Sequence, residues 1–415
     1  MTDDGAGARD PDRIAALDLI RGVAVLGILA VNLAVFAGPA ANAIAPDAWH
    51  PAGPADTAAF LAVLVLFEGK MRALFSILFG ASLVLFVDRA EDAGRDGAIL
   101  QLRRLGWLAL LGWLHWLLLW NGDILLCYAV AGTVAMMLRG LANRGLIAAA
   151  LVLFAAWQAH GTAGWLPVAR AELAEMHGTA DAADRALLAK ARQDSAGRRA
   201  RDIATLEAGF TDGASERLRE RPFEHLTTAL AWIGESIAYM LIGIALMRSG
   251  FFAGGWSALR LRLVAATGLG VGGAATLAFA GWGWSNSFPY FPMLTGIAYL
   301  MGFPHLLMAL GYAAALMLCA SALLSTAIGG RIAAAGRMAL SNYLGCTIVM
   351  CAMFFDWGLG LHSSVSWAAY PLFIALGWAL MLGWSAPWLA RFRQGPAEWL
   401  WRSLTEGRML EFRRS

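Results

Sequence analysis

The sequence has little charge and few cysteines. Only 15% of its 415 residues are charged and 59% are hydrophobic, whereas a soluble domain carries roughly 25% charged residues. The net charge is +3 and the basic residues are spread between apolar blocks, which excludes the basic surface of a nucleic-acid-binding protein. The four cysteines lie inside apolar blocks without a CxxC pair or a histidine at metal-ligand spacing, so we expect packing residues and no metal.

Common catalytic motifs are also absent from the sequence. It contains no serine nucleophile elbow, no P-loop and no HExxH zinc motif. The first apolar block has Asp18 and Arg21 at its entrance, which is unlike the basic start of a cleaved signal peptide. Any chemistry must therefore come from isolated polar residues within apolar blocks.

Long apolar blocks account for most of the chain. A helix needs about 20 mostly apolar residues to cross the hydrocarbon of a membrane. We count ten such blocks, which predict an all-α integral membrane protein. The blocks are residues 17–38, 57–88, 105–121, 123–139, 145–162, 226–248, 258–281, 296–325, 338–356 and 368–390. The second block is overlong and is interrupted by Glu68, Gly69, Lys70 and Arg72, which predicts a short interfacial helix before the span proper.

Arginine residues gather in alternate connections between the blocks. The opposite short connections, around residues 39–56, 282–295 and 357–367, contain no Lys or Arg. Because cytoplasmic loops collect basic residues, both chain termini are predicted to lie in the cytoplasm. The arginines of the predicted cytoplasmic side are Arg9, Arg13, Arg89, Arg95, Arg103, Arg104, Arg139, Arg144, Arg248, Arg260, Arg262, Arg331, Arg337, Arg391 and Arg393.

The blocks divide the chain into four parts. Residues 1–162 form an N-terminal half of five helices, and residues 225–390 form a C-terminal half of five helices. Residues 163–224 are rich in Arg, Asp, Glu and Ala, and we expect an extracytoplasmic helical loop, either a lid over the outer mouth or a solvated spacer. Residues 391–415 mix Trp with Arg, which predicts a cytoplasmic interfacial tail that anchors the protein.

Arg104 and His115 on the third block are the most informative pair. An ionisable group within a span costs roughly 2.5 to 3.5 kcal/mol, so each needs a partner or a wet cavity. Eleven helical steps place both side chains on one face, about 16 Å apart along the axis. Arg104 at the cytoplasmic lip could bind a phosphate-bearing donor, and His115 could act as a general base. Alternatively, Arg104 is a positive-inside anchor and His115 a hydrogen-bonded packing residue.

The first block repeats this layout. Asp18 and Arg21 are three residues apart, so they can form an ion pair, and Asn32 lies eleven residues beyond Arg21 on the same face. A structural ion pair and a role in substrate binding are both open. Asp123 follows a tight turn after the third block, where it can cap the next helix or orient His115.

Two further ionisable residues lie within later blocks. Glu235 is in the middle of the sixth block, so we expect an Arg or His partner from another helix. His305 follows Pro304 at a predicted kink and fits a core histidine better than a ligand.

Five segments together carry a resemblance to a known family. The chain resembles the YeiB-like family of bacterial membrane proteins, a domain of unknown function, which implies a multi-pass protein of the bacterial cytoplasmic (inner) membrane. The segments are Leu17 to Asn32 (LDLIRGVAVLGILAVN), Leu74 to Gly80 (LFSILFG), Gly112 to Tyr128 (GWLHWLLLWNGDILLCY), Gly336 to Leu344 (GRMALSNYL) and Gly395 to Thr405 (GPAEWLWRSLT).

A more distant similarity bears on activity. LDLIRG, the Arg104-x10-His115 spacing and GRMALSNYL are similar to motifs of membrane acyltransferases of the surface-sugar O-acyltransferase and heparan glucosaminide N-acetyltransferase type. The resemblance implies an acyl-CoA donor such as acetyl-CoA and a small-molecule or glycan acceptor. By position, Arg104 and His115 match the Arg/Lys-x10-His motif of these enzymes. We hypothesise a site with His115, Asp123 and Asn32 as catalytic groups and with Arg104, Arg21, Asp18 and Arg337 around the donor. Many of the sugar acyltransferases have His where this chain has Asn32, which leaves His115 as the base.

Two other functions remain open from the sequence. The first is a small-molecule or proton-coupled transporter, in which Glu235, His115 and His305 relay a proton or substrate. No internal repeat of the kind transporters favour is evident. The second is a non-catalytic membrane scaffold or sensor with a closed, dry interior. The sequence also leaves open whether the protein forms a homodimer.

Overall fold

The computed structural model describes residues 11–414, with the side chains of residues 11–14 and Ser363 left aside. Arg9, one of the predicted cytoplasmic arginines, lies outside the described residues. The described part consists of helices joined by loops, and its β-structure is limited to an isolated β-bridge between Phe392 and Arg413. The helices are α1 (Pro11–Phe36), η1 (Ala40–Ala43), α2 (Pro54–Leu66), α3 (Lys70–Asp92), α4 (Gly97–Leu118), α5 (Leu125–Leu138), α6 (Asn143–Met176), α7 (Ala182–Glu207), α8 (Phe210–Glu220), α9 (Glu224–Ala231), α10 (Ile233–Arg248), α11 (Ala258–Ser285), α12 (Tyr290–Thr295), η2 (Gly296–Leu300), α13 (Gly302–Leu324), α14 (Ala327–Arg337), α15 (Ala339–Phe354), η3 (Leu361–Ser363), η4 (Trp367–Ala369), α16 (Tyr370–Arg391) and α17 (Pro396–Glu406).

The chain is a multi-pass membrane protein. Within the described residues, six helical stretches are long and apolar enough to cross a membrane, and two bent helix pairs raise this number to eight. The bent pairs are α9 with α10, at 53°, and α14 with α15, at 87°. α4 and α5 are not among these stretches, and α5 has only 14 residues. The count of ten spans therefore remains a prediction.

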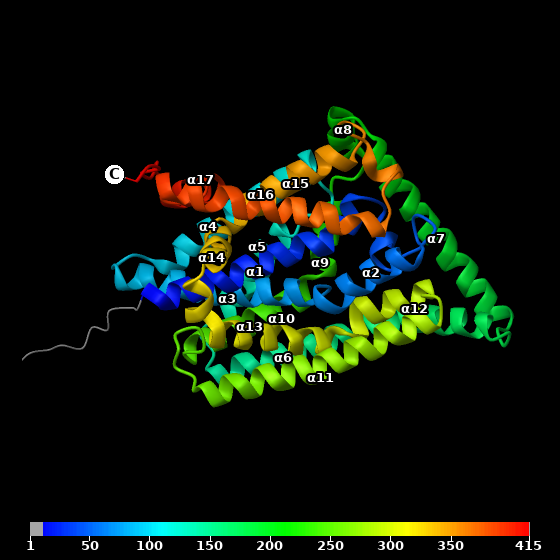
Figure 1. Cartoon of the computed structure of the whole chain (residues 1–415), viewed down its shortest axis with the longest axis horizontal. Helices are drawn as coiled ribbons and strands as arrows, with labels where there is room; N and C mark the ends of the chain where they lie inside the picture. Colours follow the sequence, from blue (N-terminus) through cyan, green and yellow to red (C-terminus); the bar gives the residue numbers. More distant parts are fainter. Residues whose placement is uncertain (1–10, 415) are drawn as a thin grey trace, which may run out of the picture.

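Most helices run along the long axis of the molecule (Figure 1). α1, α3 and α10 lie centrally, α11 and α13 form one outer face, and α15 and α16 form the other. α14 and α17 lie towards one end of this axis, whereas α7 crosses the opposite end obliquely. One end of the bundle is therefore covered by α14 and α17, and the other end by α7.

The predicted interruption of the second block is confirmed as a break between α2 and α3. Gly69 has a positive φ of 73°, and a Cβ built there would lie 2.1 Å from Nδ1 of His305, so no larger residue fits. Lys70 turns its Nζ back to the carbonyl of Leu64 at 2.7 Å. The irregularity near Pro304 is a π-helical stretch, η2, which ends just before α13.

Glycine residues allow very close helix contacts. A Cβ at Gly80 of α3 would lie 2.1 Å from the carbonyl oxygen of Met240 in α10. A Cβ at Gly336 of α14 would lie 1.9 Å from the carbonyl oxygen of Asp18 in α1. Small residues of this kind let backbones approach within membranes. The second contact fixes the start of α1 against the end of α14, and so places Asp18 beside Arg337.

Residues 163–224 pack onto the bundle. α6 continues past residue 162 to Met176, and α7 and α8 follow it across the end of the molecule (Figure 1). The Asp202 carboxylate accepts the backbone N–H of Ala40 at 3.0 Å, and buried Arg217 donates through Nε to the carbonyl of Leu117 at 3.0 Å. The segment is therefore in contact with the bundle, and its role as a lid or as a spacer stays a prediction.

Candidate functional site

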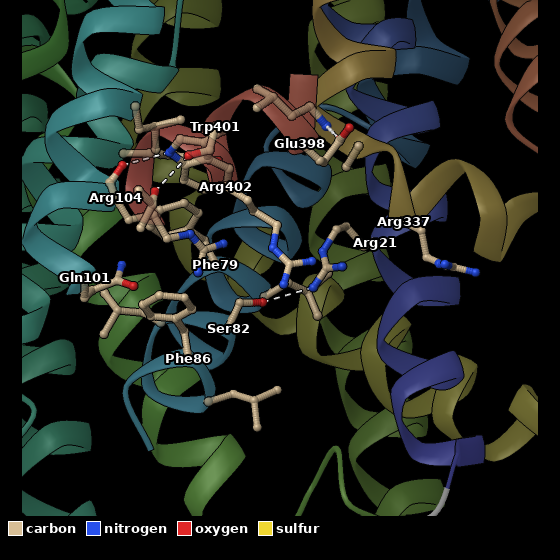
Figure 2. A pocket seen from close by; sticks show the side chains of 18 of the residues that line it. Arg21, Phe79, Ser82, Phe86, Gln101, Arg104, Arg337, Glu398, Trp401 and Arg402 are labelled. Carbon is tan, nitrogen blue, oxygen red and sulfur yellow. Dashed lines mark hydrogen bonds between the residues drawn. The ribbon is translucent and has the colours of Figure 1, made fainter. Parts of the chain in front are cut away.

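A cavity of about 550 Å³ lies between α1, α3, α4, α15 and α17 (Figure 2). This volume is within the range of about 300 to 1,000 Å³ that small-molecule sites occupy. Its walls are mostly apolar, but guanidinium groups outnumber carboxylates among its lining residues. The guanidinium groups are those of Arg21, Arg89, Arg95, Arg104, Arg337 and Arg402, and the carboxylates are those of Asp18, Glu398 and Glu406. The cavity is therefore suited to an anion with an apolar portion.

Arg104 is held between two aromatic rings. Its guanidinium carbon lies 4.7 Å from the ring centre of Phe86 and 4.3 Å from that of Trp401, an arrangement that stabilises a cation. Trp401 also donates through its indole N–H to the Arg104 carbonyl at 2.8 Å. Among residues 11–414, no carboxylate pairs with Arg104 and its buried Nε has no hydrogen-bond partner. Arg21 and Arg402 both repel it electrostatically, so an anion would relieve the local excess of positive charge.

Arg21 forms the predicted ion pair with Asp18. Its Nη1 lies 2.8 Å from Oδ1 of Asp18, and its Nη2 donates to the Ser82 hydroxyl at 3.0 Å (Figure 2). Arg337 also lines the cavity, but Figure 2 shows its guanidinium directed away from Arg21, and it donates weakly to the Arg393 carbonyl at 3.4 Å. The structure thus brings the four residues assigned to the donor to one cavity.

The C-terminal helix α17 forms part of the cavity wall, which the sequence analysis missed by assigning the tail to anchoring alone. Glu398 accepts hydrogen bonds from the backbone N–H groups of Leu340, at 2.7 Å, and Ser341, at 3.0 Å, and from the Ser341 hydroxyl. It therefore caps α15 at its sharp bend from α14. Burial raises the pKa of Glu398, and the hydrogen bonds from Ser341 oppose this effect. The family-like segment Gly395 to Thr405 (GPAEWLWRSLT), which contains Glu398, was the sequence feature that could have indicated a role in the site.

Asp123 is shared by two histidines in a fully buried cluster. Nδ1 of His115 lies 2.9 Å from Oδ1 of Asp123, and Nε2 of His225 lies 3.0 Å from Oδ2. The backbone N–H of Leu126 donates to the same carboxylate at 3.1 Å, so Asp123 both caps α5 and orients His115. His225 also stacks on Trp116, with ring centres 5.2 Å apart and an angle of 2°. His225 is not among the site residues predicted from the sequence.

His115 lies just behind the cavity wall. It does not line the cavity, whereas Tyr343 does, and the ring centres of His115 and Tyr343 are 5.1 Å apart. Within the described chain, Nε2 of His115 and the Tyr343 hydroxyl are buried without a hydrogen-bond partner. The cavity thus ends one side chain short of the imidazole.

Asn32 is separated from the main cavity. It lines a much smaller void of about 10 Å³, together with Phe36, Cys346 and Tyr343. The predicted catalytic residues therefore divide into the His115–Asp123 pair and Asn32, and Tyr343 is the polar side chain that lies next to both.

A second buried polar group lies deeper in the bundle. Arg72 pairs with Glu235 at 2.9 Å and stacks on Trp232 at 4.3 Å, and the Tyr239 hydroxyl donates to Glu235 at 2.7 Å. This confirms the expected Arg partner for Glu235. None of these four residues lines the cavity.

Comparisons with known proteins find bacterial relatives of the whole chain. The chain is 31% identical over 416 residues to the uncharacterized protein YeiB of Escherichia coli (strain K12), covering 95% of this chain and 96% of that protein. It is 29% identical to the uncharacterized protein YxaH of Bacillus subtilis (strain 168), over 95% of this chain and 94% of that protein. Residues 246–408, which include Tyr343 and Glu398, match the model of a protein family of unknown function (DUF418).

No solved structure matches the chain. The relatives align along almost the full length of both sequences, and the residues matched by the family model include those of α17. The chain therefore belongs to the family of bacterial membrane proteins that contains YeiB and YxaH.

Proposed function

We propose that this protein is a membrane-embedded acyltransferase that moves an acyl group from a cytoplasmic acyl-CoA-like donor to a small-molecule or glycan acceptor. The observation that carries the proposal is Arg104, which pairs with no carboxylate of residues 11–414 and lies at a largely apolar cavity on the same helix as His115. A phosphate-bearing donor would supply the missing negative charge, and its acyl end would enter the apolar depth. Arg21, oriented by Asp18, and Arg337 would add to the binding of the phosphates.

The contacts of His115 support a role as general base. Asp123 occupies Nδ1, so Nε2 is left with a lone pair that can accept a proton. The acceptor hydroxyl or amine attacks the thioester carbonyl carbon while Nε2 takes its proton. The carbon–sulfur bond then breaks, and the same proton passes to the leaving thiolate. The Tyr343 ring lies between the cavity and the imidazole of His115. Proton transfer to Nε2 therefore requires this ring to shift when the substrates bind.

The proposal includes the number of membrane spans and the side of the membrane on which the two termini lie. Ten spans with both termini in the cytoplasm of a bacterial inner membrane would place the cavity mouth on the donor side. Arg95, Arg104 and Arg337 support this orientation, because they line the cavity and also belong to the connections that the positive-inside rule assigns to the cytoplasm. α7 and α8 would then cover the acceptor side.

Turnover of acetyl-CoA by the purified protein tests the proposal. His115→Ala should lower transfer about 10²- to 10⁴-fold, since a positioned base contributes that much. Binding of coenzyme A, measured as thermal stabilisation, should persist in this variant. His362→Ala is the matched control. This histidine is also buried, but its Nδ1 forms a hydrogen bond with the Phe354 carbonyl at 3.0 Å and it does not line the cavity. Equal turnover by wild type and His115→Ala would refute the assignment.

A transporter remains the alternative, and the two bent helix pairs favour it. In that case the Arg72–Glu235 pair and the buried, unpartnered Nε2 of His305 would lie along the pathway. Flux into proteoliposomes that depends on Glu235, without acyl-CoA turnover, would support transport. A scaffold or sensor would show neither activity.

A further inference from the structure

The Tyr343 hydroxyl is a buried polar group without a partner. Tyr343 is 8% exposed, and its hydroxyl makes no hydrogen bond with any described residue. The backbone N–H of Ile124, another residue of the cavity wall, interacts with the hydroxyl, but the two groups form no hydrogen bond of normal length and angle. Buried hydroxyls in proteins are nearly always hydrogen-bonded, so each exception requires an explanation.

Other buried tyrosines in this chain satisfy the rule. The Tyr128 hydroxyl, which also faces the cavity, accepts from the Ser76 hydroxyl at 2.9 Å. The Tyr370 hydroxyl accepts from the Asn42 amide at 2.7 Å, and the Tyr239 hydroxyl donates to Glu235. Tyr343 therefore differs from these residues in lacking a protein partner at the point where the cavity ends.

The position of Tyr343 places its hydroxyl where the two substrates would meet. It follows the 87° bend between α14 and α15, which Glu398 and Asn342 fix through hydrogen bonds to Leu340 and Ala335. It lines both the main cavity and the small void, and only the apolar Val25 and Ile28 share this property. A donor that fills the cavity would thus bring its deepest polar atom to this hydroxyl.

We propose that Tyr343 is a catalytic residue whose hydroxyl donates a hydrogen bond to the carbonyl oxygen of the acyl donor. The inference rests on the proposed acyl transfer and adds a residue to that site. The hydrogen bond strengthens as negative charge develops on this oxygen during attack, and no proton leaves the phenol. Its contribution is therefore larger in the transition state than in the bound donor.

Tyr343→Phe tests this role, because it removes the hydroxyl and keeps the ring. We expect kcat to fall about 100-fold, since losing one donor to a developing oxyanion costs about 10²- to 10³-fold. The KM for acetyl-CoA and the stabilisation by coenzyme A should remain as in wild type. The melting temperature should stay equal or rise, because a buried polar atom without a partner is removed. Tyr370→Phe is the matched control, because it removes a hydroxyl that has a partner away from the cavity. We expect it to lower the melting temperature and to leave kcat unchanged.

The outcomes separate this inference from the proposed function. If wild type turns over acetyl-CoA and Tyr343→Phe has the same kcat, the inference is wrong and the acyltransferase stands. A loss of stability in Tyr343→Phe would also overturn it, because the hydroxyl would then have a structural partner. If wild type neither binds coenzyme A nor turns over acetyl-CoA, the proposed function fails and the inference fails with it.

Discussion

Nε2 of His225 lies 3.0 Å from Oδ2 of Asp123, although the two residues are 102 positions apart in the sequence. His225 belongs to α9, the shorter half of a bent helix pair, and its ring stacks on Trp116 of α4. The histidine therefore fixes the Asp123 carboxylate from outside the α4–α5 hairpin. Because Asp123 orients His115, this contact links α9 to the proposed base.

His225→Ala should lower kcat about tenfold, which corresponds to about 1.4 kcal/mol of transition-state free energy. The Asp123 carboxylate would keep its contacts with His115 and Leu126 but lose one of the two hydrogen bonds that hold Oδ2. The pH dependence of kcat should also shift, because the charge at Asp123 is stabilised less. His225→Gln, which can still donate, should recover part of the rate. An unaltered pH profile in His225→Ala would assign the residue to packing alone.

Arg104→Ala should raise the Kd for coenzyme A roughly 10- to 100-fold, since a hydrogen bond to a charged group contributes about 1.5 to 3 kcal/mol. Arg104→Lys should be intermediate, because Lys keeps the charge but not the planar stacking between Phe86 and Trp401. Calorimetric titration at two salt concentrations checks this, with weaker wild-type binding at high salt. Identical Kd values for the three proteins would remove Arg104 from the donor site.

The attachment of α17 should weaken in acid. Arg95 hydrogen-bonds Glu406 at 3.1 and 2.6 Å and holds the pKa of this carboxyl below its usual value of 4.5. A carboxylate with a lowered folded-state pKa adds stability above its usual pKa, and this stability is lost as the pH falls through the folded value. The pair is partly exposed, so the effect should not exceed about 1 kcal/mol.

Thermal melts of wild type and Glu406→Gln measure this effect. The wild type should be more stable at neutral pH, and the difference should vanish as the pH falls below 4.5. Glu411→Gln serves as a control for an exposed carboxylate that pairs with Arg393 at the chain end. A difference in melting temperature that is the same at all pH values would exclude titration of Glu406 as its cause.

Breaking the Arg72–Glu235 pair should destabilise the bundle strongly. Removal of one partner from a buried ion pair costs about 3 to 5 kcal/mol, because the other charge is left without compensation. Arg72→Met and Glu235→Gln should therefore each lower the melting temperature sharply, and the double variant should recover part of the loss. If the single variants remain as stable as wild type but lose substrate flux, the pair has a transport role.

Accessibility labelling checks the topology. In a cysteine-free background, a cysteine at Asp212 of α8 should react with a membrane-impermeant maleimide in intact cells. A cysteine at Arg408, just beyond α17, should react only after the inner membrane is permeabilised. Both positions are exposed, so burial does not limit either reaction. Labelling of Arg408→Cys in intact cells would contradict the cytoplasmic C-terminus.

The sequence predicted the parts of the site that helical periodicity determines. The Asp18–Arg21 pair and the break at Gly69 follow from spacing along one segment, and so does the Asp123 contact with His115 across a tight turn. His225 and Tyr343 could not be found in this way. They reach the site from positions more than 100 residues away in the sequence, and only tertiary packing brings them there.

The tail was misjudged for a related reason. Tryptophan and arginine in an amphipathic helix indicate an interface with lipid or with protein equally well, and composition does not distinguish them. Trp401 packs over Arg104 instead of facing lipid alone. The length of α6 was also underestimated, because its helix continues beyond the apolar residues into a polar segment.

Glu398 carries a consequence for biosynthesis. The residue binds the start of α15 and lies on α17, which follows all the candidate membrane-crossing helices of residues 11–414. During translation, Arg21 and Arg104 are therefore inserted long before Trp401 and Glu398 leave the ribosome. The cavity can close only after α17 is made, so under the proposed function a nascent chain should be unable to bind coenzyme A until then.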